Sequence, residues 1–294
     1  MVRYKKSLGE WAFDILNVIF MLFMIIITLY PFLFVVFASF SVPIQYLAHS
    51  GVLLRPLGFT FDAYVSVINN PNIITGYMNT LFIVFVGTAS SLLVTAMGAY
   101  VLSRKNLYWR RPLTLILIFT MYVSGGLIPN FLVVQGLGLI GSRWAVILPG
   151  LISTWNLIIL RTSFEGIPES LEESARMDGA GDVTILFKIL MPLTIPTMAV
   201  IALFYGVSYW NEWFRAMIYL PDRTMHPLQL ILRDILIQSQ TAEMTGDEAF
   251  ADRFAAAQTI RYATIIVATL PILMLYPLLQ KYFVKGVMVG AVKG

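Results

Sequence analysis

Long apolar runs restrict the fold of this chain more than any other feature. The first, at residues 15–37, is interrupted by few polar side chains, among them Asn17 and Thr28. A helix needs about 20 apolar residues to cross a hydrocarbon core about 30 Å thick. A signal-peptide core has roughly 7–15 residues and ends at a small-residue cleavage site. This run is too long and ends in bulky residues, so we expect a retained transmembrane helix.

Six segments reach or approach the length of a membrane span, at residues 15–37, 80–102, 113–134, 144–160, 195–213 and 262–279. The third contains Gly125, Gly126 and Pro129, which predict a kink or break. The fourth is short and contains Trp155 and Asn156, so we expect it to lie among other helices. Only 12% of the residues are charged, against about 25% in soluble domains. We therefore predict an all-α polytopic membrane protein with six transmembrane helices.

Basic residues predict the orientation, because cytoplasmic loops carry an excess of lysine and arginine. They lie at the N-terminus, after the second and fourth runs, and in the C-terminal tail: Arg3, Lys5, Lys6, Arg104, Lys105, Arg110, Arg111, Lys188, Lys281, Lys285 and Lys293. With six spans these all fall on one side, whereas five spans would divide them. We therefore expect both termini in the cytoplasm. The long outward loops, 41–79 and 218–261, could dock an extracytoplasmic protein or form only solvated caps.

A charge-dense segment lies between the fourth and fifth runs, at about residues 165–192. Its charged residues include Glu165, Glu169, Glu172, Glu173, Arg176, Asp178, Asp182 and Lys188. Pro168 suits the first position of a helix, and Gly179 suits the left-handed cap that ends one. Asp182 can N-cap a second helix, with Pro192 at the entry to the fifth span. The pattern predicts a helix, a glycine turn and a second helix returning to the membrane.

Two interpretations fit the first of these helices. An amphipathic connector could lie on the bilayer, but such helices tend to be rich in Lys and Arg. An acidic helix is also repelled by an anionic leaflet. Small side chains at Ser174, Ala175 and Ala180 let another surface come close. The acidity favours a helix that docks in a basic pocket of a soluble protein.

The sequence ESARMDGA at 173–180, followed by Ile189 and Pro192, resembles the EAA loop of type-I ABC-importer permeases. Ser174 stands where the family usually has its first alanine. The sequences WNE at 210–212 and VKGVMVGAVKG at 284–294 resemble the MalG-like carbohydrate permeases. RYAT at 261–264 and QKYF at 280–283 are most similar to the LplC/YtcP branch.

The resemblance implies the type I ABC transporter permease fold in a multi-pass protein of the bacterial cytoplasmic (inner) membrane. It also implies four kinds of partner: a second homologous permease subunit in a heterodimer, two ATPase subunits, an extracytoplasmic solute-binding protein, and an oligosaccharide. The LplC/YtcP likeness implies fragments of polysaccharides such as pectin or alginate. We expect three parts: residues 1–76, a permease core at 77–280 and a cytoplasmic tail at 281–294.

The resemblance further assigns coupling to the ATPase, whose cleft would hold the EAA helix. The residues carried over are Glu172, Glu173, Ala175, Asp178, Gly179 and Ala180, together with Lys293 and Gly294 of the tail. Glu173 would pair with a basic residue of the ATPase, and Gly179 would make the turn that seats the helix. The tail would enter the ATPase dimer interface, although a frayed terminus is an alternative.

We expect no catalytic site and no cofactor in this chain. It lacks a Gly-x-x-x-x-Gly-Lys-Ser/Thr phosphate loop, contains no cysteine, and its two histidines are far apart. ATP and magnesium are therefore expected on the partner ATPase, and we expect no metal site and no nucleic acid partner.

The fifth run holds the best candidates for a substrate pathway, because intramembrane polar groups are costly and mark pathways or packing contacts. The candidates are Tyr205, Tyr209, Trp210, Asn211 and Glu212, with Asn130, Trp155 and Asn156 as weaker ones. An interfacial aromatic belt with an i,i+3 pair of Glu212 and Arg215 is equally compatible. The weaker candidates could simply join helices. No Lys or Arg is firmly embedded in the predicted spans, so the cationic contacts for an acidic sugar could come from the partner permease or the binding protein.

Two other classes of membrane protein remain possible from the residues alone. An ion-coupled secondary transporter predicts midplane carboxylates and internal repeats, and neither is seen. A membrane scaffold that recruits a soluble protein through the acidic helix is the other.

Overall fold

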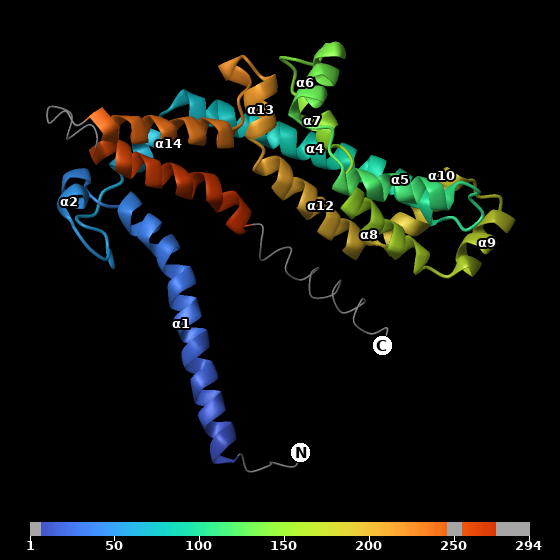
Figure 1. Ribbon diagram of the computed structural model, residues 1–294, viewed down its shortest axis with the longest axis horizontal. Coiled ribbons are helices and arrows are strands. Elements are labelled where there is room, and N and C mark those ends of the chain that lie inside the picture. The colour runs from blue at the N-terminus through green and yellow to red at the C-terminus, as the bar shows by residue number, and fades with distance from the viewer. Residues whose placement is uncertain (1–6, 246–254, 275–294) are drawn as a thin grey trace. The chain divides into compact units, whose positions relative to one another are not determined.

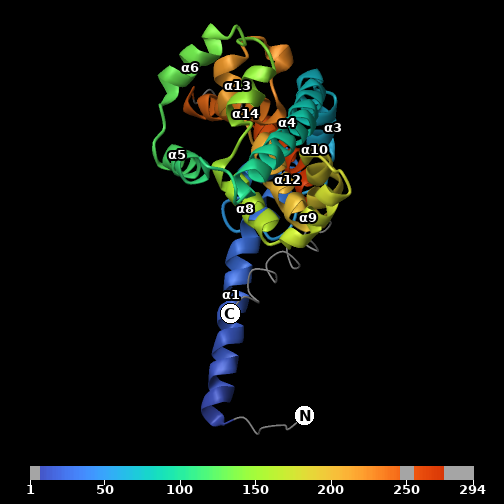
Figure 2. The same cartoon turned by 90° about the vertical axis from the view of Figure 1, so that its right-hand side faces the viewer.

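The computed structural model describes residues 7–245 and 255–274 (Figures 1 and 2). These residues belong to two compact units, one within Met1–Asn70 and Ile235–Thr269 and the other within Pro71–Asp234 and Leu270–Gly294. Each unit is helical, and the β-structure of the described residues is a single isolated bridge between Ser41 and Phe59. The predicted all-α fold class is confirmed.

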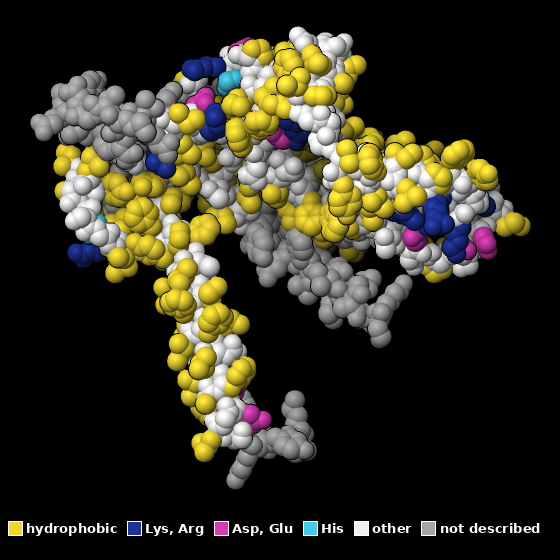
Figure 3. Space-filling view, viewed as in Figure 1, with side chains coloured by type: hydrophobic (Ala, Val, Ile, Leu, Met, Phe, Trp, Pro, Cys, Tyr) yellow, Lys and Arg dark blue, Asp and Glu magenta, His cyan; other side chains and the backbone are white. Residues whose placement is uncertain are grey.

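Helix α1, Leu8–Ser39, is the long apolar helix that the first run predicts. Ser7 begins it with a capping box, in which the Ser7 hydroxyl accepts from the Glu10 N–H and the Glu10 carboxylate accepts from the Ser7 N–H. Its apolar side chains are exposed over most of its length (Figure 3). A helix that is apolar all round requires lipid or another membrane protein as its surroundings.

The first unit also includes α2, Pro43–Ala48, α3, Asp62–Ile68, and most of a helix at Ala255–Met274. The hydroxyls of Tyr46 and Tyr262 lie 2.9 Å apart, and the ring of Phe34 packs edge-on against both tyrosines. The segment after α1 is therefore folded against the Ala255–Met274 helix.

Three helices of the second unit pack side by side: α4, Pro71–Ser103, α8, Thr154–Glu165, and α12, Ile195–Trp210 (Figures 1 and 2). Small residues of α4 permit the close approach. A Cβ at Gly87 would come within 2.8 Å of the Tyr209 ring. Ser91 bonds the Tyr209 hydroxyl at 2.9 Å, and Thr95 bonds the Tyr205 hydroxyl at 2.7 Å. Close packing and buried hydroxyl pairs together fix α12 on α4.

Three pairs of helical stretches are bent at short breaks, two of them within predicted spans and one at the start of the fifth span. They are α5 (Arg110–Tyr122) with α6 (Leu127–Gly136) at 115°, α7 (Trp144–Ile147) and a 3-10 turn (Leu148–Gly150) with α8 at 54°, and the stretch Asp182–Leu193 with α12 at 88°. The predicted break at Gly125 and Gly126 is confirmed, and Gly126 has a positive φ of 86°. The predicted span at 144–160 is also interrupted, because a non-helical turn at residues 151–153 separates the 3-10 turn from α8. Three described helices are long enough to cross a membrane, or up to six if each bent pair is one span.

The segment after α12 contains α13, Phe214–Tyr219, a 3-10 turn, Arg223–Met225, and α14, Leu228–Thr245. Much of the 218–261 loop is thus helical. Asn79, 3% exposed, holds this segment against the start of α4. Its amide nitrogen donates to the carbonyls of Thr224 and His226 at 2.7 and 3.1 Å, and its oxygen accepts from Arg143 at 2.7 Å.

Candidate functional site

The acidic segment begins with helix α9, Glu169–Met177. Pro168 is its N-cap, with ψ at 131°, so the helix starts one residue later than predicted. At the other end Gly179 has a φ of 84°. The Ala180 N–H donates to the Ala175 carbonyl at 2.9 Å, and the Gly179 N–H to the Arg176 carbonyl at 3.0 Å. These two bonds form a Schellman motif, so the predicted glycine turn is confirmed.

A second helical stretch follows directly, made of α10, Asp182–Thr184, a π-helix, Ile185–Leu190, and α11, Met191–Leu193. The prediction that Asp182 caps it was wrong, because Gly181 is the N-cap and no side chain caps this end. The Asp182 carboxylate instead accepts from the Tyr100 hydroxyl at 2.7 Å and from Arg176 at 2.5 Å. The hydrogen bond from Tyr100 and then the contact with Arg176 hold the pKa of Asp182 below its usual value.

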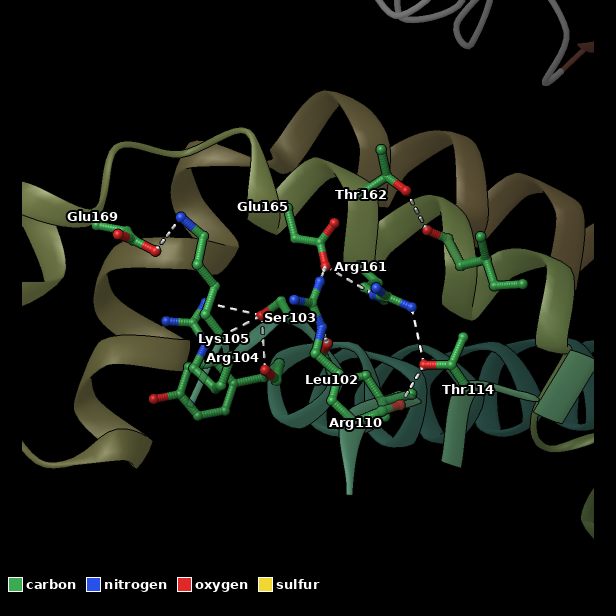
Figure 4. A network of polar contacts seen from close by, with 12 residues as sticks. Leu102, Ser103, Arg104, Lys105, Arg110, Thr114, Arg161, Thr162, Glu165 and Glu169 are labelled. Carbon is green, nitrogen blue, oxygen red and sulfur yellow. Dashed lines mark hydrogen bonds and ion pairs between the residues drawn. The ribbon is translucent and has the colours of Figure 1, made fainter. Parts of the chain in front are cut away.

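Ion pairs attach α9 to the end of α4. Glu172, whose side chain is 16% exposed, pairs with Arg104 and bonds Arg176 at 3.0 Å. Glu169 pairs with Lys105 at 2.8 Å (Figure 4), and this contact lowers the pKa of Glu169. Arg104 and Lys105, two of the basic residues that predict the orientation, are thus partners of the acidic helix.

A second cluster joins α8 to α5. Glu165, the last residue of α8, accepts from Arg161 at 2.8 Å and pairs with Arg110 (Figure 4). Arg161 also donates to the Thr114 hydroxyl at 3.1 Å, and Arg110 to the carbonyl of Leu102 at 3.0 Å. The ends of α4, α5, α8 and α9 therefore meet in one charged network, and charged side chains gather at this end of the unit in Figure 3.

Two acids of this segment remain unpaired, Glu173 on α9 and Asp178 at its C-cap. Glu173 and Asp178 are exposed, and the side chain of neither makes an ion pair or hydrogen bond with any described residue. Ala175 and Ala180 face inward and pack against the hydrophobic core of the second unit. Glu169 and Glu172 thus attach α9 to this chain, while Glu173, which lines the same groove as these two acids, and Asp178 keep free carboxylates.

The tyrosines of the fifth run are buried packing residues. The Tyr205 hydroxyl accepts from the backbone N–H of Ser153 at 2.9 Å, in addition to its bond with Thr95. The Tyr209 hydroxyl donates to the Ile147 carbonyl at 3.2 Å. Trp210 is 5% exposed, and its ring packs edge-on against Tyr77. Most of their polar and aromatic surface is used within the helical core.

Asn211 and Glu212 lie just beyond α12. The Asn211 amide donates to the carbonyl of Val207 at 2.9 Å. Glu212 accepts from the Arg215 backbone N–H at 2.9 Å and from its Nε at 2.6 Å. The predicted i,i+3 pair of Glu212 and Arg215 is confirmed.

Two grooves of the second unit share one basic side chain. The first, of about 450 Å³, is lined by Gly150, Ile152, Ser153, Trp155, Asn156, Phe204, Tyr205, Ser208 and Arg215. The second, of about 580 Å³, contains Asn130 and again Arg215. The structure therefore brings Trp155, Asn156 and Tyr205 together. It places Asn130 in the neighbouring groove.

A family model described as "Binding-protein-dependent transport system inner membrane component" matches residues 87–289. The chain belongs to this family. Over 96% of its length it is 43% identical to the polygalacturonan/rhamnogalacturonan transport system permease protein YtcP of Bacillus subtilis, covering 98% of that protein. It is 40% identical to protein LplC of the same organism, covering 96% of this chain and 95% of the relative.

A solved structure of a bacterial ABC transporter involved in the import of the acidic polysaccharide alginate is also similar, with a TM-score of 0.86 and 33% identity. The match covers 95% of this chain and 99% of that one. The resemblance to ABC-importer permeases of the LplC/YtcP branch is thus confirmed, and the chain is a non-catalytic transport component of a bacterial membrane.

The charged network and both grooves of this permease lie within the matched residues 87–289. Lys293 and Gly294 lie beyond that range and outside the described residues. Their predicted coupling role stays a prediction. The ion pairs of Arg104 and Lys105 with α9 were not predicted. The only signal for them in the sequence is that a basic loop after the second span and the acidic segment after the fourth span are both expected on the cytoplasmic side.

Proposed function

We propose that this permease takes up oligosaccharides derived from acidic polysaccharides, such as fragments of pectin or alginate, in an ATP-driven importer. It works as a heterodimer with a second homologous permease subunit. Two ATPase subunits, which bind ATP and magnesium, power it from the cytoplasm, and an extracytoplasmic solute-binding protein delivers the sugar. The chain then has six spans in the cytoplasmic membrane, with both termini inside.

The observation that carries this proposal is the division of the acids of α9 and its C-cap into paired and unpaired ones. Glu173 and Asp178 are exposed and free to meet a basic cleft on an ATPase. Glu169 and Glu172 are paired with bases just beyond the end of α4. Closure of the ATPase dimer can therefore move α4, and with it the helices packed on α4. The proposed coupling residues are Glu172, Glu173, Ala175, Asp178, Gly179 and Ala180, with Lys293 and Gly294 in the tail.

Support for the substrate class comes from the first groove and from the relatives. Sugar rings stack on aromatic faces, and their hydroxyls bond amides and hydroxyls. The groove offers Trp155, 60% exposed, beside Asn156 and Ser208. Polygalacturonan and alginate, which appear in the descriptions of two similar proteins, are both polymers of uronic acids. We propose that the sugar passes this groove, in residues 77–280 of the chain.

The test is reconstitution of this chain with its partner permease, its ATPases and its binding protein in proteoliposomes. We expect ATP-dependent accumulation of trigalacturonate, and ATP hydrolysis that rises when the loaded binding protein is added. Accumulation driven by an ion gradient without ATP would favour a secondary transporter instead. An assembly that carries no sugar yet still binds the ATPase would favour a scaffold.

A further inference from the structure

Arg215 is the basic residue that lines both grooves, among the residues that the structure describes. It lies in α13, five residues beyond the end of α12, and its side chain is 22% exposed. A largely buried charge is costly unless it is paired or hydrogen-bonded. Glu212 supplies one partner, so the question is what the rest of the guanidinium does.

The guanidinium has a used edge and a free edge. Glu212 accepts through Oε2 from Nε and also pairs with Nη2. Nη1 makes no hydrogen bond with a described residue. It is also not fully buried, because the buried polar atoms without a partner do not include it. Because a guanidinium offers five N–H groups in a planar fork, the edge formed by Nη1 and Nη2 can still receive a second carboxylate.

Gly150 provides the space that this arrangement needs. A Cβ at residue 150 would collide with Nη1 of Arg215 and would lie 3.0 Å from its Cζ and Nη2. The guanidinium therefore occupies the room where any other residue would have its side chain. Glu212 on one side and Gly150 on the other hold it in the wall of the first groove.

We propose that Arg215 is a specificity-determining residue that binds the carboxylate of a uronic acid unit as the sugar passes through this permease. The inference deepens the function proposed above and rests on it. Charge-assisted bonds from arginine to a carboxylate are short, strong and geometrically specific. Trp155 presents a ring face for the same sugar unit, and Asn156 and Ser208 present groups for its hydroxyls.

Glu212 fits this assignment as a positioning residue. It fixes the side chain through three contacts, from the backbone N–H, Nε and Nη2 of Arg215. It also offsets the charge while the groove is empty, so that the cation is not left alone in an apolar surrounding. The proposal adds a cationic contact within this chain to those expected on the partner permease or the binding protein.

The experiment compares two probes of equal length in proteoliposomes that contain the complete importer. One probe is trigalacturonate and the other is its methyl ester, which has the same rings without negative charge. For Arg215→Gln we expect uptake of trigalacturonate to fall about tenfold or more. Uptake of the ester should change less than twofold.

Three further variants keep the result interpretable. The double variant Glu212→Gln/Arg215→Gln leaves no unpaired carboxylate at this position. It should show the same loss of trigalacturonate uptake, with uptake of the methyl ester unchanged. Arg215→Lys keeps the positive charge but not the planar guanidinium. Its uptake of trigalacturonate should lie between those of the wild type and Arg215→Gln. Arg223→Gln removes a positive charge from an exposed position, and both probes should be carried as by the wild type.

Each outcome decides one point. If the wild type carries the acid and Arg215→Gln carries it equally well, the assignment to Arg215 is overturned while the proposed function stands. Equal losses for both probes, with normal assembly, would assign Arg215 to structure alone. If the wild-type importer carries neither probe under ATP, the proposed substrate class fails, and the assignment fails with it.

Discussion

The guanidinium of Arg104, one residue beyond the end of α4, forms an ion pair with the carboxylate of Glu172 on α9. The adjacent carboxylate, Glu173, is exposed and has no partner among the described residues. Neighbouring acids on one helix therefore differ in their contacts, because one is paired within this chain and the other is free. Since α4 packs on both α8 and α12, a displacement of α9 reaches the core through this pair.

Reversing the charge at Glu173 should prevent docking without disturbing the fold. Glu173→Arg would face the proposed basic cleft with a like charge, and like-charge contacts cost several kcal/mol at an interface. We expect normal membrane insertion and loss of the ATPase from the purified complex, measured by co-purification.

Glu172→Gln is the matched variant one residue away. It removes the ion pair with Arg104 but leaves the free carboxylates of Glu173 and Asp178, so the ATPase should still co-purify. Sugar-stimulated ATP hydrolysis should fall, because α9 is no longer attached firmly to α4. Normal ATPase recovery with Glu173→Arg would contradict docking through this residue.

The turn after α9 depends on the conformation of one glycine. Gly179 has a φ of 84°, while a Cβ there would meet open space, so substitution brings strain without a clash. The left-handed conformation costs a residue with a Cβ about 1–2 kcal/mol. Gly179→Ala should destabilise the turn by about that amount, seen as faster amide exchange at Ala180. Gly181, at φ −81° with equally open surroundings, is the control, and Gly181→Ala should leave exchange unchanged.

How much of this could be predicted from the sequence depends on the range of each interaction. The glycine turn at Gly179 and the break at Gly126 follow from local backbone preferences, and both were predicted. The pairing of Asp182 was not predicted, because an acid at the start of a helix is expected from local sequence alone to cap that helix. Tyr100 and Arg176, which compete for the carboxylate, come from a distant helix and from the preceding one.

The substrate candidates show the same limit. Composition marks Tyr205, Tyr209 and Trp155 alike as aromatic residues in apolar runs. Only the packing of α4 on α12 separates the two buried tyrosines from the 60% exposed indole of Trp155. The space at Gly150 that admits Arg215 is likewise a property of two segments brought together, and no local pattern reports it.

The contacts of Asp182 make a prediction about pH. Its pKa is lowered in the folded protein, so its contribution to stability is present above the unfolded pKa of about 3.9. The contribution is lost as the pH falls through the lowered folded value. Asp182→Asn should therefore speed amide exchange at Ile185, by the same factor at pH 6 and pH 8 after correction for the intrinsic rate. A difference that changed across this neutral range would show that another group controls the turn.

Tyr209 provides a test of packing against transport. Tyr209→Phe removes one hydroxyl that bonds Ser91 and the Ile147 carbonyl, which should lower stability by about 1–3 kcal/mol because buried groups lose a partner. We expect a lower thermal midpoint of the purified complex. The ratio of uptake between trigalacturonate and its methyl ester should stay the same, and a changed ratio would instead place this hydroxyl in contact with the sugar.

Gly150 offers a test of the groove that leaves Arg215 itself unchanged. A Cβ at this position would occupy the site of the guanidinium, so Gly150→Ala should displace the arginine from the groove wall while its charge and Glu212 remain. We expect reduced uptake of trigalacturonate with little change for the methyl ester, the same selectivity as in Arg215→Gln. Gly136→Ala is the matched control, because a Cβ there meets nothing within 4 Å. If Gly150→Ala carries both probes normally, the position of the guanidinium in this groove does not determine selectivity for the acid.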